Sequence, residues 1–354
     1  MLVFPFQFFQ WILFFLHQFS SLNFSTFLVM SKFKIISRPL GTVQCYVLTR
    51  NDGAEFEILS GYGAGLNAWR VPCRQTGKLQ DLLFGYREGD DIFKMGPDTN
   101  AGCRLTPFPG RTAYAKFNWN GNDYQLVNNV SWAPHALHGF LQNKEWAFKC
   151  FESDSDKCTA EFTCDWPGAF AGFPFPFRAT NKITFTGESY TVEASVTNIG
   201  KADMPYSEGW HPYFMLGEKI DELTMTLPET DFAELDKADI PTGKFHADTR
   251  FVGGRKINDE FINDCFCLGN EFKESEGKTA HMSLQGKFGT IDIWQNAGRG
   301  QYNAIQIYTP STRMSIAIEP MTAEPDALNH HRGLIVIPAG ESRTFKFGAT
   351  ISKQ

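Results

Sequence analysis

Apolar and polar residues alternate in short runs along most of this chain, and turn residues separate the runs. An alternation with a period of two places apolar side chains on one face of a β-strand. The runs that predict strands most clearly are Val43–Leu48, Glu55–Leu59, Leu82–Tyr86, Leu223–Leu227, Ile262–Leu268, Thr290–Trp294, Ala304–Tyr308, Ser315–Ile318, Leu334–Ile337 and Thr344–Ile351. Residues 145–199 alternate in the same way over a longer stretch. The density of these runs predicts an all-β protein.

Turn signals lie where the runs end. Asn120-Gly121 sits in the middle of the stretch Lys116–Leu126 and predicts a two-residue hairpin turn. Ile240–Gly243 and Pro338–Glu341 combine proline with glycine and are predicted as turns. Strands joined by such short connections pair antiparallel.

The glycine-rich stretch Gly61–Leu66 is not followed by a helical pattern. We therefore predict a tight turn there and not a phosphate-binding loop. Residues 30–354 contain no long heptad, no repeat of fixed period and no linker. This range is predicted to form one large antiparallel β-sandwich domain.

The first 29 residues differ from the rest of the chain. They contain no Lys, Arg, Asp or Glu and include the apolar run Trp11–Leu16. Polar residues interrupt the apolar character too often for a membrane span, and the basic region and cleavage site of a signal peptide are missing. Residues 1–29 are interpreted as an apolar extension produced by an early start codon, with Met30 as the true start. A leader or a membrane anchor is the alternative.

The net charge of the chain argues against two classes of binding partner, nucleic acids and anionic membranes. The chain has 354 residues, a formal net charge of -6 and a pI near 5.8. A negative chain without a basic cluster is a poor binder of nucleic acid or of an anionic membrane. We expect neither as a partner of the folded domain.

The spacing of the eight cysteines bears on the redox compartment of the protein. Cys265 and Cys267 are two residues apart, which places both on one face of a strand and matches neither a zinc motif nor a short disulfide loop. Buried thiols without a disulfide framework are typical of a reducing compartment. The sequence therefore predicts a cytoplasmic protein.

His211 lies in the stretch Glu208–Phe214, between Trp210 and Pro212. Proline fixes its own φ and restricts the residue before it, so the backbone at His211 is expected to be stiff. A held imidazole beside aromatic side chains suits a proton donor next to a sugar ring. From this stretch alone, the favoured interpretation is a core histidine bonded to a backbone carbonyl.

Glu319 ends an apolar strand and precedes a proline. A partly desolvated carboxylate there has a raised pKa and is a stronger base. The structural alternative is a buried ion pair with Arg111 or Arg313. Arg111 follows Gly110, which lets the chain turn sharply, and its own alternative is an ordinary ion pair.

His135 and His138 lie three residues apart in a loop that ends in Gly139. The chain lacks the close His-x-His, Glu and His spacing of a cupin-type metal site, so we predict no metal. It also lacks a serine nucleophile elbow and a glycine-rich loop before a helix. We expect no cofactor.

Together, four motifs in order resemble the aldose 1-epimerase, or galactose mutarotase-like, family between about Val43 and Ile351. They are Gly110-Arg111 before an aromatic hairpin, His135-Ala136-Leu137-His138-Gly139, Gly209-Trp210-His211-Pro212-Tyr213-Phe214, and Ile318-Glu319-Pro320-Met321-Thr322 through Pro325–Asn329. The resemblance implies a β-supersandwich with an open carbohydrate cleft.

The resemblance also implies roles for residues. By position, His211 is the general acid at the sugar ring oxygen and Glu319 is the general base at the anomeric hydroxyl. His138 and Arg111 then bind substrate. A substrate-binding aspartate of the family is replaced here by Asn263, and Asp264 replaces it only if the strand register shifts by one.

The expected function is therefore that of an isomerase in carbohydrate and hexose metabolism, a mutarotase that interconverts the α and β anomers of a hexose such as glucose or galactose. One alternative is an epimerase of hexose 6-phosphates, with Arg87, Arg104 and Arg111 as candidate phosphate ligands. The other is a non-catalytic carbohydrate-binding β-sandwich. A small sugar is the expected partner, and the protein is expected to be a monomer or a homodimer.

Overall fold

The computed structural model describes residues 32–73 and 76–353. The chain in these ranges is mostly β-strand, and the named strands pair antiparallel, which confirms the predicted all-β class. The predicted extension over residues 1–29 lies outside the described residues. Among the described helices, none has the length and apolar character needed to cross a membrane.

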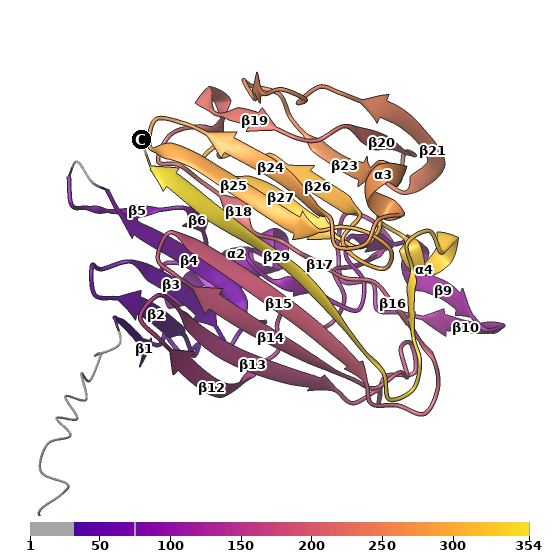
Figure 1. The fold of residues 1–354 in the computed structure, drawn as a ribbon. Helices are drawn as coiled ribbons and strands as arrows, with labels where there is room; N and C mark the ends of the chain where they lie inside the picture. Colours follow the sequence, from indigo (N-terminus) through magenta and orange to yellow (C-terminus); the bar gives the residue numbers. More distant parts are fainter. Residues whose placement is uncertain (1–31, 74–75, 354) are drawn as a thin grey trace, which may run out of the picture. The chain divides into compact units, whose positions relative to one another are not determined.

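The first large sheet has nine strands in the order β12-β13-β14-β15-β29-β25-β24-β19-β22. Its C-terminal strand β29 lies between β15 and β25, so the end of the chain joins the two halves of the sheet (Figure 1). The strands are β12 (Ala147–Ser153), β13 (Cys158–Trp166), β14 (Phe177–Phe185), β15 (Ser189–Asn198), β29 (Ser342–Lys353), β25 (Gly289–Asn296), β24 (Thr279–Gln285), β19 (Thr224–Thr226) and β22 (Arg255–Lys256).

The second large sheet follows the order β21-β20-β23-β26-β27-β17-β7, with β18 paired to β27 and β6 paired to β18. Its central strands β23, β26 and β27 carry much of the candidate chemistry. The strands are β21 (Pro241–Asp248), β20 (Thr230–Leu235), β23 (Asn263–Leu268), β26 (Ala304–Tyr308), β27 (Ile316–Met321), β17 (Gly209–Trp210), β7 (Arg104–Leu105), β18 (Tyr213–Phe214) and β6 (Leu83–Phe84).

A five-stranded sheet forms the N-terminal part of the described chain, and short ribbons and helices complete the fold. Its strands are β1 (Phe33–Ser37), β2 (Tyr46–Arg50), β3 (Glu55–Leu59), β4 (Gly65–Pro72) and β5 (Leu79–Asp81). The ribbons pair β8 (Arg111–Thr112) with β11 (Ala136–Leu137), β9 (Lys116–Trp119) with β10 (Asn122–Gln125), and β16 (Met204–Tyr206) with β28 (Ile335–Ile337). The helices are α2 (Gly89–Thr99), α3 (Asn270–Lys273), α4 (Ala327–His330), and the 3-10 turns η1 (Ala113–Ala115) and η2 (Ile220–Glu222).

The two large sheets pack against each other through aromatic side chains. Trp210 of β17 contacts Phe347 of β29 at a ring-centroid distance of 5.3 Å. Tyr302, just before β26, contacts Phe345 of β29 at 5.6 Å. Aromatic pairs of this kind combine a large buried apolar area with a defined geometry.

Alternation along β27 separates the core from the site. Ile316 and Ile318 belong to the main hydrophobic core, so Ala317 and Glu319 face the opposite side of the sheet. The face of β27 opposite the main core therefore carries Glu319 beside the smaller hydrophobic cluster that includes Ala317.

One of two predicted turns differs from the structure, and the other agrees with it. The predicted turn at Ile240–Gly243 is wrong, because β21 already begins at Pro241. The reversal lies at residues 236–239, where the Asp236 carboxylate accepts hydrogen bonds from the backbone N–H groups of Ala238 and Ile240. The hairpin turn at Asn120-Gly121 is confirmed, with both residues at positive φ.

Helix α2 has no counterpart in the strand pattern. The Asp91 side chain accepts hydrogen bonds from the backbone N–H groups of Arg87 and Glu88, which stabilises its first turn. Gly96 and Pro97 interrupt the sequence signal of this helix, since neither residue favours a helix interior.

Candidate active site

One cavity of about 690 Å³ contains all five predicted site residues. Arg111, His138, His211, Asn263 and Glu319 come from different strands and loops but line the same space. The other lining residues are Pro97, Asp98, Asn100, Gly110, Asn129, Val130, Ser131, Trp132, Leu137, Tyr213, Asp239, Phe261, Gln306, Tyr308, Met321 and Pro325.

Strand pairing brings His211 and Glu319 together. Gly209 pairs with Met321 and Tyr213 pairs with Ala317, so His211 lies opposite the middle of β27. The imidazole Nε2 of His211 is 3.4 Å from the carboxylate Oε1 of Glu319. Both side chains are almost fully buried at the base of the cavity.

The backbone of His211 is held on both sides. Its N–H donates to the Cys103 carbonyl and its own carbonyl accepts from the Gly102 N–H, at 3.0 and 2.8 Å. Its ring stacks on Tyr213, with centroids 4.8 Å apart and an interplanar angle of 19°. Trp210 points into the core instead, so Tyr213 lines the cavity and Trp210 does not.

His138 faces His211 edge to face, with ring centroids 5.5 Å apart. The Nδ1 atom of His138 accepts a hydrogen bond from the Gly110 backbone N–H at 3.2 Å. Neutral His138 therefore carries its hydrogen on Nε2 and is a donor there. His135 is fully buried, accepts from the Tyr114 N–H and contacts the Ala238 carbonyl at 3.0 Å, so it is the hydrogen-bonded turn residue that its spacing suggested.

The backbone turn before Arg111 needs glycine. Gly110 has a φ of +60°, and a Cβ at this position would lie 2.9 Å from the ring of Pro325. The Arg111 carbonyl accepts from the Asp326 N–H at 2.7 Å, which holds β8 against the loop that follows β27.

The Arg111 side chain is largely buried beside the cavity. Its Nη2 lies 3.6 Å from Asp239, and its guanidinium lies 5.3 Å from the ring centroid of Trp132. Its Nε is buried without a hydrogen-bond partner. A ligand oxygen is a suitable partner for such a donor.

Glu319 does not form the alternative buried ion pair with Arg111 or with Arg313. Arg313 pairs with Asp221 at 2.7 Å, and Arg111 has Asp239 as its nearest carboxylate partner. The close neighbour of Glu319 is His211.

Burial changes the protonation of the site. It lowers the pKa of the His211 imidazole to about 3. Burial also lowers the pKa of His138 well below its ordinary value, and the charges of His211 and Arg111 act in the same direction. It raises the pKa of the Glu319 carboxyl well above its ordinary value, while the positive charge of Arg111 opposes the increase. Both shifts favour the uncharged form of each group, so a proton shared by the pair resides on Glu319 in preference to His211.

Asn263 lies in the cavity, and its neighbour does not. The Asn263 Oδ1 accepts a hydrogen bond from the Gln306 Nε2 at 3.0 Å, which leaves the Asn263 amide hydrogens for other partners. Asp264 points to the other face of β23 and pairs with Arg250 at 2.7 Å. The register is therefore not shifted, and an amide stands at this position of the cavity.

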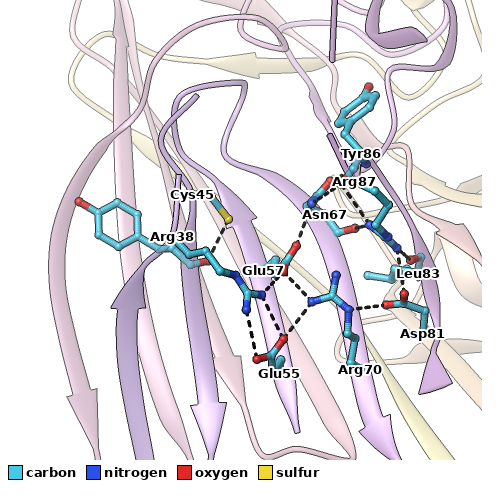
Figure 2. A network of polar contacts seen from close by, with 11 residues as sticks. Arg38, Cys45, Glu55, Glu57, Asn67, Arg70, Asp81, Leu83, Tyr86 and Arg87 are labelled. Atoms are coloured by element: carbon cyan, nitrogen blue, oxygen red, sulfur yellow. Dashed lines mark hydrogen bonds and ion pairs between the residues drawn. The ribbon is translucent and has the colours of Figure 1, made fainter. Parts of the chain in front are cut away.

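The three candidate phosphate ligands are not brought together. Arg104 is fully buried and pairs with Glu208. Arg87 points toward Asp81 and the Leu83 carbonyl in the polar network of the N-terminal sheet (Figure 2). Only Arg111 lines the cavity.

Several cavity residues were not identified from the sequence. Gln306 and Tyr308 lie on a predicted strand, and their spacing of two gave the only available signal. Asp239, Trp132 and Phe261 lie on loops, where the sequence carries no periodic signal. Within residues 32–73 and 76–353, no group of three or more His, Cys, Asp or Glu side chains is placed to hold a metal ion.

Solved structures share this fold. A galactose mutarotase-like protein from Clostridium acetobutylicum superposes with a TM-score of 0.79 and 18% identity, covering 91% of this chain and 99% of that one. A galactose 1-epimerase from Lactobacillus acidophilus superposes with a TM-score of 0.73 and 14% identity, covering 91% and 99%. The predicted supersandwich is therefore confirmed as a galactose mutarotase-like fold.

The family follows from the sequence match. The profile described as "Aldose 1-epimerase" matches residues 44–350. The chain belongs to the aldose 1-epimerase family.

Two curated relatives come from Escherichia coli K12. The uncharacterized protein YihR is 25% identical over 260 residues, or 71% of this chain and 79% of that protein. The uncharacterized protein YphB is 35% identical over 124 residues, which span 35% of this chain and only 40% of YphB.

Proposed function

We propose that this protein is an aldose 1-epimerase that interconverts the α and β anomers of a neutral, unphosphorylated aldose. The observation that carries the proposal is the contact of His211 Nε2 with Glu319 Oε1 at 3.4 Å, at the base of a cavity lined by hydrogen-bonding groups. The anomeric hydroxyl oxygen and the ring oxygen are bonded to the same carbon. A reaction that moves protons at both oxygens therefore needs an acid and a base that are close neighbours.

Ring opening assigns one step to each group. In the form of the pair that carries its shared proton on His211, Glu319 removes the proton of the anomeric hydroxyl, His211 protonates the ring oxygen, and the bond between C1 and that oxygen breaks as the aldehyde forms. Rotation about C1–C2 presents the other face of the aldehyde. Closure reverses both proton transfers, so the shared proton returns to its starting point without a cofactor.

The surrounding residues position the sugar. The Nε2–H of His138 is directed to donate to a sugar oxygen, because its Nδ1 is occupied by the Gly110 N–H. The unpartnered Nε of Arg111 and the free amide hydrogens of Asn263 offer donors to further hydroxyls. Arg111 is the only arginine in the cavity among the described residues, which favours a neutral sugar over a hexose 6-phosphate.

Anomer-exchange NMR on α-glucose, α-galactose and glucose 6-phosphate tests the proposal. We expect purified protein to accelerate exchange of at least one free hexose well above the spontaneous rate and above its effect on glucose 6-phosphate. Faster exchange of the phosphorylated sugar would favour the alternative substrate. If the protein binds sugars but does not accelerate anomer exchange, the result supports the alternative of a non-catalytic carbohydrate-binding β-sandwich.

The pH dependence of kcat/KM follows from the shared proton. Lowering the pH through the depressed pKa of His211 adds a second proton and removes the base, whereas raising it through the elevated pKa of Glu319 removes the only proton and with it the acid. We therefore expect activity to be kept as the pH falls below the ordinary histidine range near about pH 6.5, and to be lost as the pH rises through the elevated pKa of Glu319. Exchange rates from about pH 5 to 9, corrected for the spontaneous reaction, measure the profile. A loss of activity on lowering the pH from about 6.5 to about 5 contradicts this account.

A further inference from the structure

Two large aromatic side chains are exposed at the mouth of the catalytic cavity. Trp132 is 56% exposed and Phe261 is 69% exposed, and both line the cavity that contains His211 and Glu319. Single exposed apolar residues are common on protein surfaces. These two come from loops that are far apart in the sequence and meet at one cavity, and they are the only large exposed apolar residues of the described chain that line it.

Each aromatic side chain packs against a residue that lies deeper in the cavity. Trp132 lies over the guanidinium of Arg111 at 5.3 Å. Phe261 packs edge to face on Tyr308, with centroids 6.2 Å apart and an interplanar angle of 88°. The backbone N–H after Phe261, that of Ile262, donates to the Thr309 hydroxyl at 2.9 Å, which fixes the base of the Phe261 loop.

The volume of the cavity exceeds what one sugar ring needs. At about 690 Å³ it falls in the middle of the range of about 300–1,000 Å³ that encloses drug-sized ligands. A hexose is a much smaller molecule. A hexose held at His211 and Glu319 leaves the region around Trp132 and Phe261 unfilled.

The direction of the bound ring places a substituent at the mouth. The anomeric carbon must lie at the buried pair, since His211 and Glu319 are only 7% and 2% exposed. The opposite end of a pyranose ring, which carries the 4-hydroxyl, then points toward solvent. A sugar linked through that oxygen lies beside the two aromatic side chains.

We propose that the mouth of the cavity is a second sugar subsite and that the preferred substrates are reducing 1,4-linked disaccharides. The inference rests on the proposed function for the chemistry at the reducing ring. The C–H face of the second ring packs on Trp132 or Phe261, as carbohydrate rings do on aromatic surfaces. The carboxylates of Asp98 and Asp239 at the same cavity accept hydrogen bonds from its hydroxyls.

Substrate selectivity tests the subsite. We expect kcat/KM for anomer exchange of maltose, cellobiose or lactose to exceed that for glucose and galactose. Trp132→Ala and Phe261→Ala should each lower the ratio of disaccharide to monosaccharide kcat/KM by between about twofold and tenfold. Phe93→Ala is the matched control, because Phe93 is 66% exposed but does not line the cavity. An unchanged ratio in both mouth variants overturns the proposal. Phe261→Ala is needed beside Trp132→Ala because the tryptophan also contacts Arg111.

A binding measurement separates this inference from the proposed function. Calorimetric titration of maltose, cellobiose and lactose into the Glu319→Gln protein needs no turnover. Weaker disaccharide binding on adding Trp132→Ala or Phe261→Ala, with little change for the monosaccharide, supports the subsite even if no sugar undergoes exchange. Equal binding of monosaccharide and disaccharide in all variants removes the subsite, even if the protein is an active mutarotase.

Discussion

The Glu319→Gln variant is expected to lose roughly 10²–10⁴-fold in kcat/KM for anomer exchange, and His211→Asn to lose a similar amount. Either change leaves a neutral polar side chain of similar size, so the cavity keeps its shape while the pair loses its acid–base function. Exchange NMR on the free sugar that the wild type converts fastest measures the rate. Because the pair works as one unit, the double variant should lose little more than either single variant.

The controls for this result are already in the cavity. Gln306→Ala removes a polar side chain that lines the same space but holds no proton for exchange, so its effect should appear mainly in KM. Circular dichroism and denaturant unfolding of each variant check that the fold is kept. Wild-type activity in Glu319→Gln would falsify the catalytic assignment, and wild-type activity in His211→Asn would return His211 to a core role.

The second large effect is a loss of folding stability, which we expect for the variant Glu208→Gln in the buried network behind the site. Arg104 and Glu208 are both fully buried and form an ion pair. Glu208 also accepts hydrogen bonds from the hydroxyls of Tyr206 and Tyr302, each at 2.6 Å. Removing the carboxylate leaves the Arg104 charge uncompensated in the core, which typically costs about 3–5 kcal/mol.

Denaturant unfolding measures this loss, and an exposed ion pair supplies the comparison. Asp165→Asn breaks the contact with Arg178, where both side chains are about half exposed, and should cost only about 0–1 kcal/mol. Similar stabilities for the Glu208 and Asp165 variants would mean that the buried network contributes little. We expect activity to fall as well, because loosening the side-chain network of Glu208 disturbs the backbone just before β17, which is bonded to Thr322 after β27.

Part of the site could be predicted because proline marks it. His211 precedes Pro212 and Glu319 precedes Pro320, so both positions were recognisable as stiff backbone carrying an ionisable group. Their distance could not be predicted, since it depends on the pairing of β17 and β18 with β27. Pairing between distant strands is a property of the whole sheet.

The cavity-facing residues of β26 show what an alternating pattern cannot predict. The run Ala304–Tyr308 predicted a strand correctly, and alternation requires Gln306 and Tyr308 to share a face. The apolar Ile305 and Ile307 fill the core, but an alternating run does not say whether its other face meets solvent or a ligand. Trp132 and Phe261 were missed for a different reason, because loop conformation follows from the contacts around it.

Arg104 shows how a charge can mislead. In the sequence it is an arginine near a candidate site and therefore a plausible phosphate ligand. In the fold its Nη1 donates to Asn181 and to two backbone carbonyls of β14 and β15, so it joins the sheets and does not meet the cavity.

The division of β27 and its neighbours into two faces bears on how this protein can change. Asn263 and Gln306 alternate with residues that hold the sandwich together, and they line the cavity without belonging to that packing. Substitutions at these two positions can therefore accumulate at little thermodynamic cost while the substrate range shifts. The scaffold is suited to diversification, and a combinatorial library limited to this face should yield folded variants with altered sugar preference more often than one that includes Ile305, Ile307 and Ile318.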